Sequence, residues 1–333
     1  MYRLLWLCLL QVLSGLALAA CSRDIVVPFS EQGVDQWHSA GKRLGLSIDF
    51  LEEVSQRTGC RFVYIDVPRA RAWWMFARGQ ADMVLGAVRN AWRDKFGMFY
   101  GQHVYEAVSL ISLKTRSLQL NFHEAILESG LTFAFVRGHD YGPKTANLIK
   151  TLASQDRLVL AKDPSTMLRM LQAGRVNGAI VLASTVTVDA LHLGLDDALT
   201  GIVVDNLDWT TSGLYLSPTS LAPEDEELLA RALIELNSEG FYTRLAQEPL
   251  RKQPAWVQAS IRLDHRPTPC SIGSNGKGSA NQSTGQRCTI RTDRVLTLST
   301  GTKSCLPDLE TSPAGLAQRT SPPGKHLTDL VAN

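Results

Sequence analysis

The sequence has little of what marks metal sites and common catalytic centres. It has six cysteines in 333 residues, with no CxxC pair and no His/Cys pair at metal-site spacing. This argues against a zinc site and a disulfide-dense scaffold. The patterns GxSxG, HExxH, GxxxxGK and GxGxxG are absent, so the sites they mark are not predicted. We therefore expect no catalytic residue, no metal and no cofactor. The cysteines are Cys8, Cys21, Cys60, Cys270, Cys288 and Cys305.

A charge bias is also missing. Lys and Arg number 34 and Asp and Glu number 32, a formal net charge of +2. A nucleic-acid-binding protein normally carries a clear basic excess, so no such partner is expected. With 44% hydrophobic and 20% charged residues, the composition is that of a soluble globular protein. After residue 21, no apolar run approaches the roughly 20 residues that a membrane-spanning helix needs.

The first 21 residues have the pattern of an export signal. Arg3 precedes an apolar stretch at 4–10, and the small residues Ala19 and Ala20 stand just before Cys21. A charged start, a short apolar core and a small-residue cleavage site are typical of a secretory signal peptide. We therefore predict that residues 1–21 direct the chain out of the cytoplasm.

Residues 18–21, Leu-Ala-Ala-Cys, also resemble the lipobox of bacterial lipoproteins. On this reading Cys21 is lipidated and becomes the mature N-terminus, and Ser22 after it favours the outer membrane over the inner one. The alternative is a plain signal peptide that is cut after Ala19 or Ala20 and leaves Cys21 as an ordinary thiol. Both readings export the protein, so the predicted location is the periplasm, with or without a lipid anchor.

The mature chain alternates strand and helix patterns. Short β-branched or apolar runs at 25–29, 61–65 and 83–85 are separated by helical patterns at 48–57 and 68–79. Such alternation predicts βαβ units and a mostly parallel sheet. Gly59 is placed to end the first of these helices.

A second series of the same kind follows Lys114. It has strands at 131–136, 176–182 and 202–204, and helices that start at Gly138, at Asp163-Pro164 and at Ser184. A strand at 213–216 then returns the chain to the first series, and two helices at 223–238 and 241–247 complete it. We predict an α/β fold of two lobes, each with a mostly parallel sheet flanked by helices, joined by hinge strands. The expected boundaries are 22–112 with 208–250 for lobe 1 and 113–207 for lobe 2.

The last part of the chain has a different composition. No Phe, Tyr or Trp follows Trp256, and Ser, Thr, Gly and Pro dominate. Such a segment buries too little apolar surface to offset the entropy lost on ordering it. We therefore predict that residues 251–333 form a disordered tail.

Five short motifs, taken in order, resemble the family 3 extracellular solute-binding proteins, which have the type II periplasmic-binding fold. The resemblance covers about 23–250. It implies a receptor that binds a small polar solute, such as an amino acid or organic acid, between its lobes. It also implies delivery to an inner-membrane transporter permease or to a signalling partner, and we expect a monomer. The motifs lie at 45–51 with 58–59, 69–82, 86–93, 136–142 and 171–179.

The resemblance also implies ligand contacts. Arg93 matches the arginine that usually pairs with the ligand carboxylate, to which a guanidinium offers a planar fork of donors. Gly86 and Ala87 end a strand, where backbone groups can meet a ligand. Residues 138–141 stand where a helix is expected to begin, so their free N–H groups suit an anion. The full set of expected contacts is Phe29, Arg69, Arg71, Gly86, Ala87, Arg93, Gly138, His139, Asp140 and Tyr141.

One departure from the family bears on the ligand. Many amino-acid-binding members have an acidic residue shortly after the motif at 171–179, where it holds the ligand ammonium. Here the chain continues through 180–184 as Ile-Val-Leu-Ala-Ser, without a carboxylate. An unpaired ammonium in a closed cleft would be costly, so an organic acid or another anion is an alternative to an α-amino acid.

Two alternatives to a transport receptor stay open at this point. The same fold serves periplasmic dehydratases, which need a general acid or base in the cleft. Glu31, His38, His139 and Asp140 are candidates by position alone. The other alternative is a sensor-like domain that recognises a protein partner.

Overall fold

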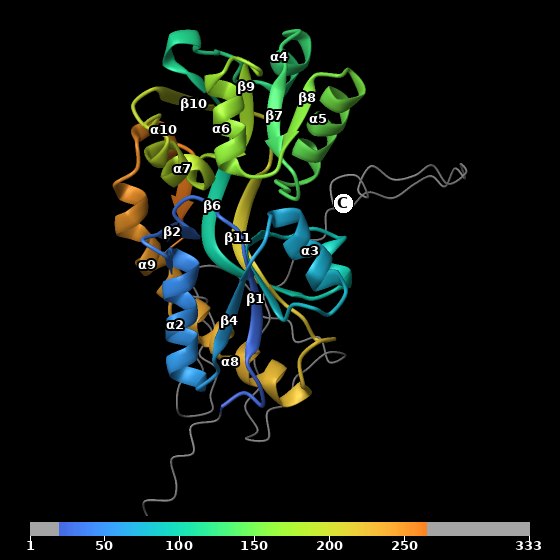
Figure 1. Ribbon diagram of the computed structural model, residues 1–333, viewed down its shortest axis with the longest axis vertical. Helices are drawn as coiled ribbons and strands as arrows, with labels where there is room; N and C mark the ends of the chain where they lie inside the picture. The colour runs from blue at the N-terminus through green and yellow to red at the C-terminus, as the bar shows by residue number, and fades with distance from the viewer. Residues whose placement is uncertain (1–19, 265–333) are drawn as a thin grey trace, which may run out of the picture. The chain divides into compact units, whose positions relative to one another are not determined.

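The computed structural model describes residues 20–264. Most of the predicted export signal and the chain after Asp264, including four of the six cysteines, lie outside the described residues. Within 20–264 the chain forms two groups of helices and strands, lobe 1 and lobe 2, which the strands β6 and β11 connect (Figure 1). The predicted two-lobed α/β fold is therefore confirmed, but its sheets combine parallel and antiparallel pairs rather than being mostly parallel.

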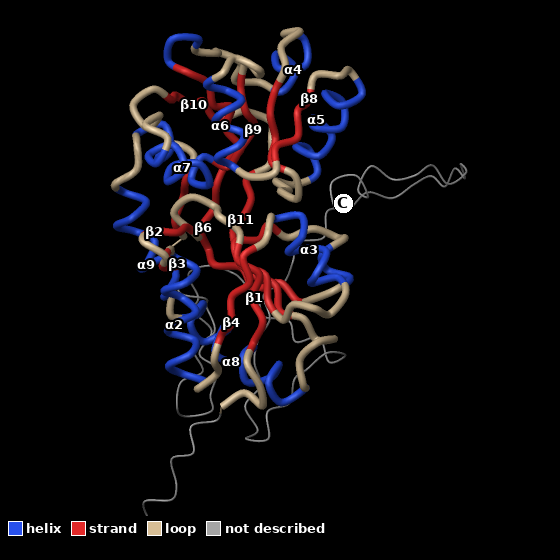
Figure 2. The backbone as a smooth tube through the Cα atoms, viewed as in Figure 1, coloured by secondary structure: helices blue, strands red, loops and turns tan. Residues whose placement is uncertain are grey.

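In lobe 1 the two-stranded sheet of β1 and β4 is separate from the sheet that contains β5, β11 and β6, and helices lie on both sides of these strands (Figure 2). β1 pairs in parallel with β4, and β11 pairs antiparallel with both β5 and β6. Its elements are β1 (Ile25–Phe29), β2 (Trp37–Ser39), β3 (Lys42–Leu44), α2 (Leu46–Thr58), β4 (Phe62–Asp66), α3 (Arg69–Ala77), β5 (Met83–Val88), η1 (Arg93–Lys95), the first part of β6 (Met98–Leu113), β11 (Trp209–Leu216), α8 (Pro223–Ser238) and α9 (Phe241–Arg251).

Lobe 2 is built around β7, which pairs in parallel with β8 and β9, while β6 pairs antiparallel with β9 and β10. Its helix α6 begins as the sequence predicts, because the Asp163 side chain accepts a hydrogen bond from Thr166 N at 2.7 Å. Its elements are η2 (Lys114–Arg116), α4 (His123–Glu128), β7 (Phe133–Val136), α5 (Pro143–Ser154), β8 (Leu158–Ala161), α6 (Pro164–Gln172), β9 (Gly178–Leu182), η3 (Ala183–Val186), α7 (Thr187–His192) and β10 (Leu199–Val203).

The first βαβ unit follows directly from the local sequence. Ile25 and Val27 alternate along β1 and are fully buried, and Phe50, Leu51 and Val54 of α2 are buried in the same core. Gly59 ends α2 in the left-handed conformation, with φ of 73°, which glycine adopts without steric cost. The predicted helix end at Gly59 is therefore confirmed.

The long strand β6 belongs to both lobes. Its residues up to Ala107 pair with β11, and from Val108 onward it pairs with β9 and β10. The passage between the lobes thus lies at Ala107–Val108, a few residues before the predicted boundary at 112. One strand thus continues from the paired strands of lobe 1 into those of lobe 2.

The predicted tail begins too early at residue 251. Residues up to Leu263 are ordered, with α10 (Ala255–Gln258) followed by β12 (Ile261–Leu263), which pairs antiparallel with β6. Val257 and Ser260 are fully buried. Trp256 packs with the apolar core of lobe 2, so this segment runs from lobe 1 to lobe 2 and back to the hinge. The composition after residue 251 is mainly polar, so it does not reveal that a few buried side chains are enough to order residues 252–263.

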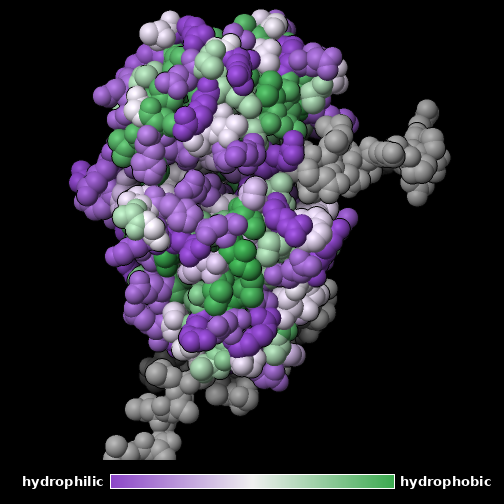
Figure 3. All heavy atoms as spheres, viewed as in Figure 1, coloured by the Kyte–Doolittle hydropathy of each residue, from purple (hydrophilic) through white to green (hydrophobic). Residues whose placement is uncertain are grey.

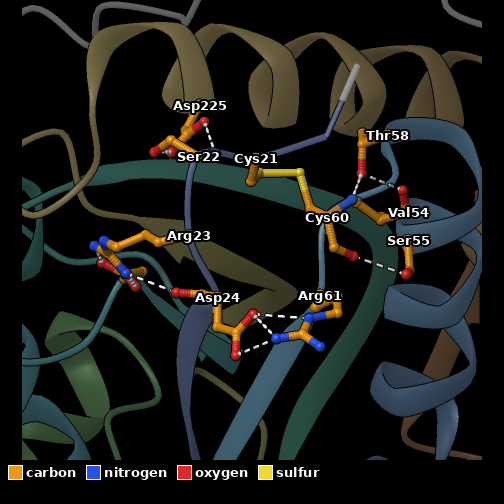
Figure 4. The surroundings of a disulfide bond; sticks show 11 residues. Cys21, Ser22, Arg23, Asp24, Val54, Ser55, Thr58, Cys60, Arg61 and Asp225 are labelled. Carbon is orange, nitrogen blue, oxygen red and sulfur yellow. Dashed lines mark hydrogen bonds and ion pairs between the residues drawn. A yellow bond between two sulfur atoms is a disulfide. The ribbon is translucent and has the colours of Figure 1, made fainter. Parts of the chain in front are cut away.

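The structure contradicts the predicted lipidation of Cys21. Cys21 forms a disulfide with Cys60, which follows α2 (Figure 4). The same sulfur cannot also carry a lipid thioether, so Cys21 is neither an acylation site nor an incidental thiol.

Further contacts of the N-terminal segment fix it to lobe 1. Ser22 N and Oγ donate to the carboxylate of Asp225 at 2.9 and 2.6 Å. The Arg23 guanidinium makes two hydrogen bonds of 2.7 Å to the carboxylate of Asp82, which is buried. Ser22 and Arg23 are thus part of the fold.

The described surface is mainly hydrophilic, with local apolar areas. Val63 and Ile65 of β4 are 43% and 39% exposed. Figure 3 shows apolar atoms gathered over the part of lobe 1 where β1 and β4 lie. Among residues 20–264, no helix is both long and apolar enough to cross a membrane.

Candidate functional site

A polar cavity lies where the two lobes meet. It is lined by side chains from the loop after β1, from α3 and β5, from the loop after β7 and from the end of β9, with Glu106 of β6 at the hinge. Its lining residues are Gln32, Asp35, Arg69, Gly86, Val88, Arg93, Glu106, His139, Asp140, Tyr141, Leu182, Ser184, Thr185 and Ser212.

Six of the predicted ligand contacts line this cavity, and a seventh touches one of them. The six are Arg69, Gly86, Arg93, His139, Asp140 and Tyr141. Gly138 is the seventh, since its carbonyl accepts a hydrogen bond from Arg93.

Phe29, Arg71 and Ala87 do not line the cavity. Phe29 is buried on the same face of β1 as Ile25 and Val27, because side chains alternate along a strand. Ala87 likewise points away from Gly86 and Val88, into the core with Trp73. Arg71 is exposed and stacks on Trp74. It lies two positions after Arg69 on α3, so the two side chains face different ways and only Arg69 reaches the cavity.

Arg93 bridges the two lobes. Its side chain is nearly buried, 3% exposed, and its guanidinium donates to Val88 O of lobe 1 and to Gly138 O of lobe 2. The guanidinium also lies 3.9 Å from the centre of the Trp73 ring, a cation–π distance. Burial lowers the pKa of Arg93 to about 10, so it stays charged at neutral pH.

Arg69 is the second buried arginine at the cavity. Its guanidinium donates at 2.8 Å to Leu85 O and to Gly86 O, at the end of β5. Burial, with a smaller contribution from the charge of Arg93, lowers the pKa of Arg69 to about 9. Within residues 20–264, neither Arg69 nor Arg93 forms a salt bridge with a carboxylate.

His139 adds an unpaired polar atom. The residue is 5% exposed, and its Nδ1 contacts the Tyr141 hydroxyl. Its Nε2 is buried without a hydrogen-bond partner among the described residues. Burial, and then the charges of Arg69 and Arg93, hold the pKa of His139 well below its usual value. The ring is therefore neutral, with one nitrogen free to meet a bound group.

Glu106 supplies a carboxylate that the sequence analysis missed. Its two oxygens accept from Ser184 N at 2.8 Å and Ser184 Oγ at 2.6 Å. Burial raises the pKa of Glu106 to about 7 against these hydrogen bonds. The only signal in the sequence is a single acid in a long strand whose later residues are apolar.

Asp35 and Asp140 complete the acidic part of the cavity. Asp35 accepts from Ser47 Oγ at 2.7 Å and from Tyr242 Oη at 2.6 Å. Asp140 accepts from Gly142 N at 2.9 Å and from Asn90, across the lobes. Both carboxylates are thus already engaged by neutral donors.

The helix expected to begin at Gly138 begins later. α5 starts at Pro143, while Gly138 and Gly142 have φ of 84° and 96°, outside the helical region. Residues 138–142 therefore form a loop, and the prediction of helix-terminal N–H groups at this place is wrong. The loop reaches the cavity through its side chains and through Gly138 O.

Two of the predicted acid–base candidates lie away from the cavity. His38 contacts Glu31 through Nδ1 and Asp66 through Nε2, both at 3.0 Å, and its side chain is 36% exposed. No group of His, Cys, Asp and Glu residues within 20–264 is arranged to hold a metal ion.

Comparison with solved structures identifies the fold, whereas no protein-family model and no curated protein matches the chain. A histidine kinase sensor domain with similarity to periplasmic binding proteins is 16% identical, with a TM-score of 0.57, over 68% of this chain and 95% of that one. The arginine-, lysine-, histidine-binding protein ArtJ from the thermophilic bacterium Geobacillus stearothermophilus is 16% identical, with a TM-score of 0.58, over 70% and 97%. An ancestral amino acid-binding protein, a precursor of cyclohexadienyl dehydratase, is 13% identical, with a TM-score of 0.54, over 72% and 98%. The chain therefore shares its fold with two-lobed periplasmic binding proteins.

Proposed function

We propose that the chain is an exported solute-binding protein that closes its two lobes around a small polar solute carrying a carboxylate or another anionic group. The solute would lie between Arg69 and Arg93, with His139 Nε2 as a further contact. The bound solute would bridge both lobes and select the closed form, and the chain itself would perform no chemistry.

The observation that carries this proposal is the state of the two arginines. Both are buried, and burial lowers both pKa values, which means that each charge is held at a cost. Backbone carbonyls take only two of the five N–H donors of each guanidinium. An anion in the cavity would accept from the remaining donors and offset the cost of two buried positive charges.

The acidic residues of the cavity indicate what chemical group the solute carries besides its anionic end. Glu106 stands at the hinge and could accept from a donor group of the solute, although the acid usual in amino-acid-binding members is absent at 180–184. We therefore propose a polar solute with an anionic end, either an organic acid or an amino-acid-like molecule.

The proposed location is the periplasm. The Cys21–Cys60 disulfide supports export, because such bonds persist in oxidising compartments. The export signal predicted at 1–21 agrees with this. We propose a transporter permease or a signalling protein as the partner, since transport receptors and a kinase sensor domain share the fold.

A thermal-shift panel tests the proposal. The mature chain is unfolded and refolded to remove endogenous solute, then heated with amino acids, organic acids, phosphate and polyamines. A solute at about 100 times its dissociation constant stabilises the native state by about 2.7 kcal/mol. We expect anionic or zwitterionic solutes to raise the melting temperature and polyamines to have no effect. A shift with polyamines alone would overturn the proposed anion site.

A second candidate function rests on Glu106. A carboxyl group with a pKa of about 7 in a polar cavity can act as a general acid at neutral pH, and a dehydratase precursor shares the fold. In this case a solute that raises the melting temperature would also be consumed. NMR spectra of the mixture over several hours distinguish binding from turnover.

A further inference from the structure

Ser184 of lobe 2 is hydrogen-bonded to Glu106 of the connecting strand β6. It follows β9, and its backbone N–H and hydroxyl donate to the two carboxylate oxygens of Glu106, at 2.8 and 2.6 Å. Glu106 lies in β6 just before the strand leaves lobe 1, and it is 7% exposed. Both oxygens of a buried carboxylate are thus used to hold one serine of the other lobe.

The carbonyl of the same serine touches lobe 1. Val34 N donates to Ser184 O at 3.4 Å. Gly33 comes so close that a Cβ at this position would lie 1.9 Å from Ser184 O, and its φ is 54°, so only glycine fits. Gly33 and Val34 belong to the loop 32–35, whose Gln32 and Asp35 line the cavity. Ser184 therefore connects the hinge strand with the loop that covers the cavity from the lobe 1 side.

We propose that Glu106 is a positioning residue, which fixes Ser184 so that the loop 32–35 docks on it and the lobes stay closed over the cavity. The inference rests on the proposed function, because it assigns the contact that holds the binding cleft shut. Glu106 acts through Ser184: when its hydrogen bonds to Ser184 are lost, the closed form is lost.

The surroundings of Glu106 make this contact sensitive to pH. Ser184 and Ala183 donate to it, and Asp35, Asp140, Tyr141, Tyr242, Arg69, Arg93 and His139 are the other titratable groups around the cavity and Glu106. None of the cations pairs with it, so burial dominates and raises the pKa of Glu106 to about 7, compared with about 4.3 in water. If opening exposes the group to water, the closed form binds a proton that the open form releases.

The sign of the effect follows from linkage. Closure is favoured below pH 7 and weakens as the pH rises from about 4.5 to 7. If opening fully hydrates the carboxyl group, the closed-to-open ratio falls by roughly a hundredfold over this range. Above pH 7 Glu106 is ionised in both forms, and the ratio no longer depends on it.

The test measures the distance between the lobes without added solute. The full mature chain carries spin labels at Glu52→Cys on α2 and Lys150→Cys on α5, which are both exposed. Cys270, Cys288 and Cys305 are changed to Ser, and the Cys21–Cys60 disulfide is retained. Electron–electron double resonance then gives the closed fraction from pH 4.5 to 8, compared with Glu106→Gln, Glu106→Ala and Gly33→Ala in the same background.

We expect the closed fraction of the labelled parent to fall as the pH rises to 7. Glu106→Gln should keep a constant closed fraction, because the amide still holds Ser184 but does not titrate. Glu106→Ala and Gly33→Ala should open the lobes at every pH. Asp189→Asn is the control, since the pKa of this buried acid in lobe 2 is also raised to about 7, and it should keep the parent profile.

Two results would overturn the inference. One is a Glu106→Gln profile that follows the parent, and the other is a Gly33→Ala chain that stays as closed as the parent. Because no solute is added, these results do not depend on whether the cavity binds an anion. If no solute shifts the melting temperature but Glu106→Gln removes the pH dependence, the proposed function fails and the role of Glu106 stands.

Discussion

The guanidinium of Arg93 lies 3.9 Å from the centre of the Trp73 ring, on the lobe 1 side of the cavity. The same guanidinium donates to Gly138 O of lobe 2. Arg93 is therefore fixed by an aromatic face and by backbone oxygens rather than by a carboxylate. This arrangement leaves its charge available to a solute that enters the cavity.

Replacing Arg93 with Lys should weaken solute binding at least tenfold, which is about 1.4 kcal/mol. Lysine keeps the charge but loses the planar fork of donors and much of the stacking on Trp73. The matched control is Arg71→Lys, because Arg71 also stacks on a tryptophan but is exposed. Titration calorimetry with a solute found by thermal shift should show normal affinity for this control. Equal weakening in both variants would refute a specific role of Arg93.

Loss of the Cys21–Cys60 disulfide should destabilise the protein, and Cys21 should carry no lipid. The bond closes a loop of 39 residues, for which the chain-entropy model gives about 4 kcal/mol. Cys21→Ser with Cys60→Ser should therefore lower the free energy of unfolding in urea, and dithiothreitol should have the same effect on the wild type. Intact-mass measurement of the exported wild type should show no lipid. A diacylglycerol mass on Cys21 would contradict the structure at this point.

Stability should be greatest at about pH 5 and decline toward pH 8. Burial raises the pKa values of Glu106 and Asp189 to about 7. Their contribution is present below the unfolded pKa of about 4 and is lost as the pH rises through 7, on the order of 4 kcal/mol per group at most. Burial alone would raise the pKa of Asp82, but the hydrogen bonds that it accepts from Arg23, Ser220 and Val26 lower it below its usual value. As the pH falls below 4 this carboxylate becomes protonated and its contribution to stability is lost.

Urea unfolding from pH 4 to 8 measures this profile. Glu106→Gln and Asp189→Asn should each flatten the decline between pH 5 and 8, and the double variant should flatten it further. A decline that is unchanged in the double variant would show that other groups cause it.

Trp256 and Gly201 should be energetically coupled across the segment 252–264. A Cβ on Gly201 would lie 2.4 Å from the Trp256 ring, so Gly201→Ala should cost about 1–3 kcal/mol through overpacking. In a Trp256→Ala background the same change should cost much less. A double-mutant cycle by urea unfolding measures this coupling. Independent effects would mean that α10 does not pack on lobe 2 in solution.

The sequence predicts the βαβ units well because their signals are local. β1 and α8 have the predicted bounds, and the ends of α2 and α6 follow from Gly59 and from the Asp163 cap. The helix expected at Gly138 fails for a local reason too. Two glycines with positive φ and the bond from Gly142 N to Asp140 form a loop, which a hydrophobic pattern does not reveal.

The candidate site is predicted only in part, because its residues meet through the tertiary structure. Gly86 is predicted at the cavity from its position near the end of a strand, and it lies there. Phe29 and Ala87 also lie near strand ends, but side chains alternate along a strand, and theirs point into the core. Glu106 enters the site because β6 runs from one sheet into the other. The partner of Cys21 could not be read from spacing, because the fold alone brings Cys60 to it.

The most direct test of the proposed function is calorimetric titration of refolded protein with the solute that gives the largest thermal shift, compared with Arg69→Gln. Arg69 donates to the backbone carbonyls of Leu85 and Gly86 and pairs with no carboxylate among residues 20–264, so its charge should be directed at the solute. We predict one binding site per chain in the wild type and an affinity at least tenfold lower in the variant, with the fold retained by circular dichroism. Equal affinity in a folded Arg69→Gln variant, or no binding of any anionic solute to the wild type, would contradict an anion site between the lobes.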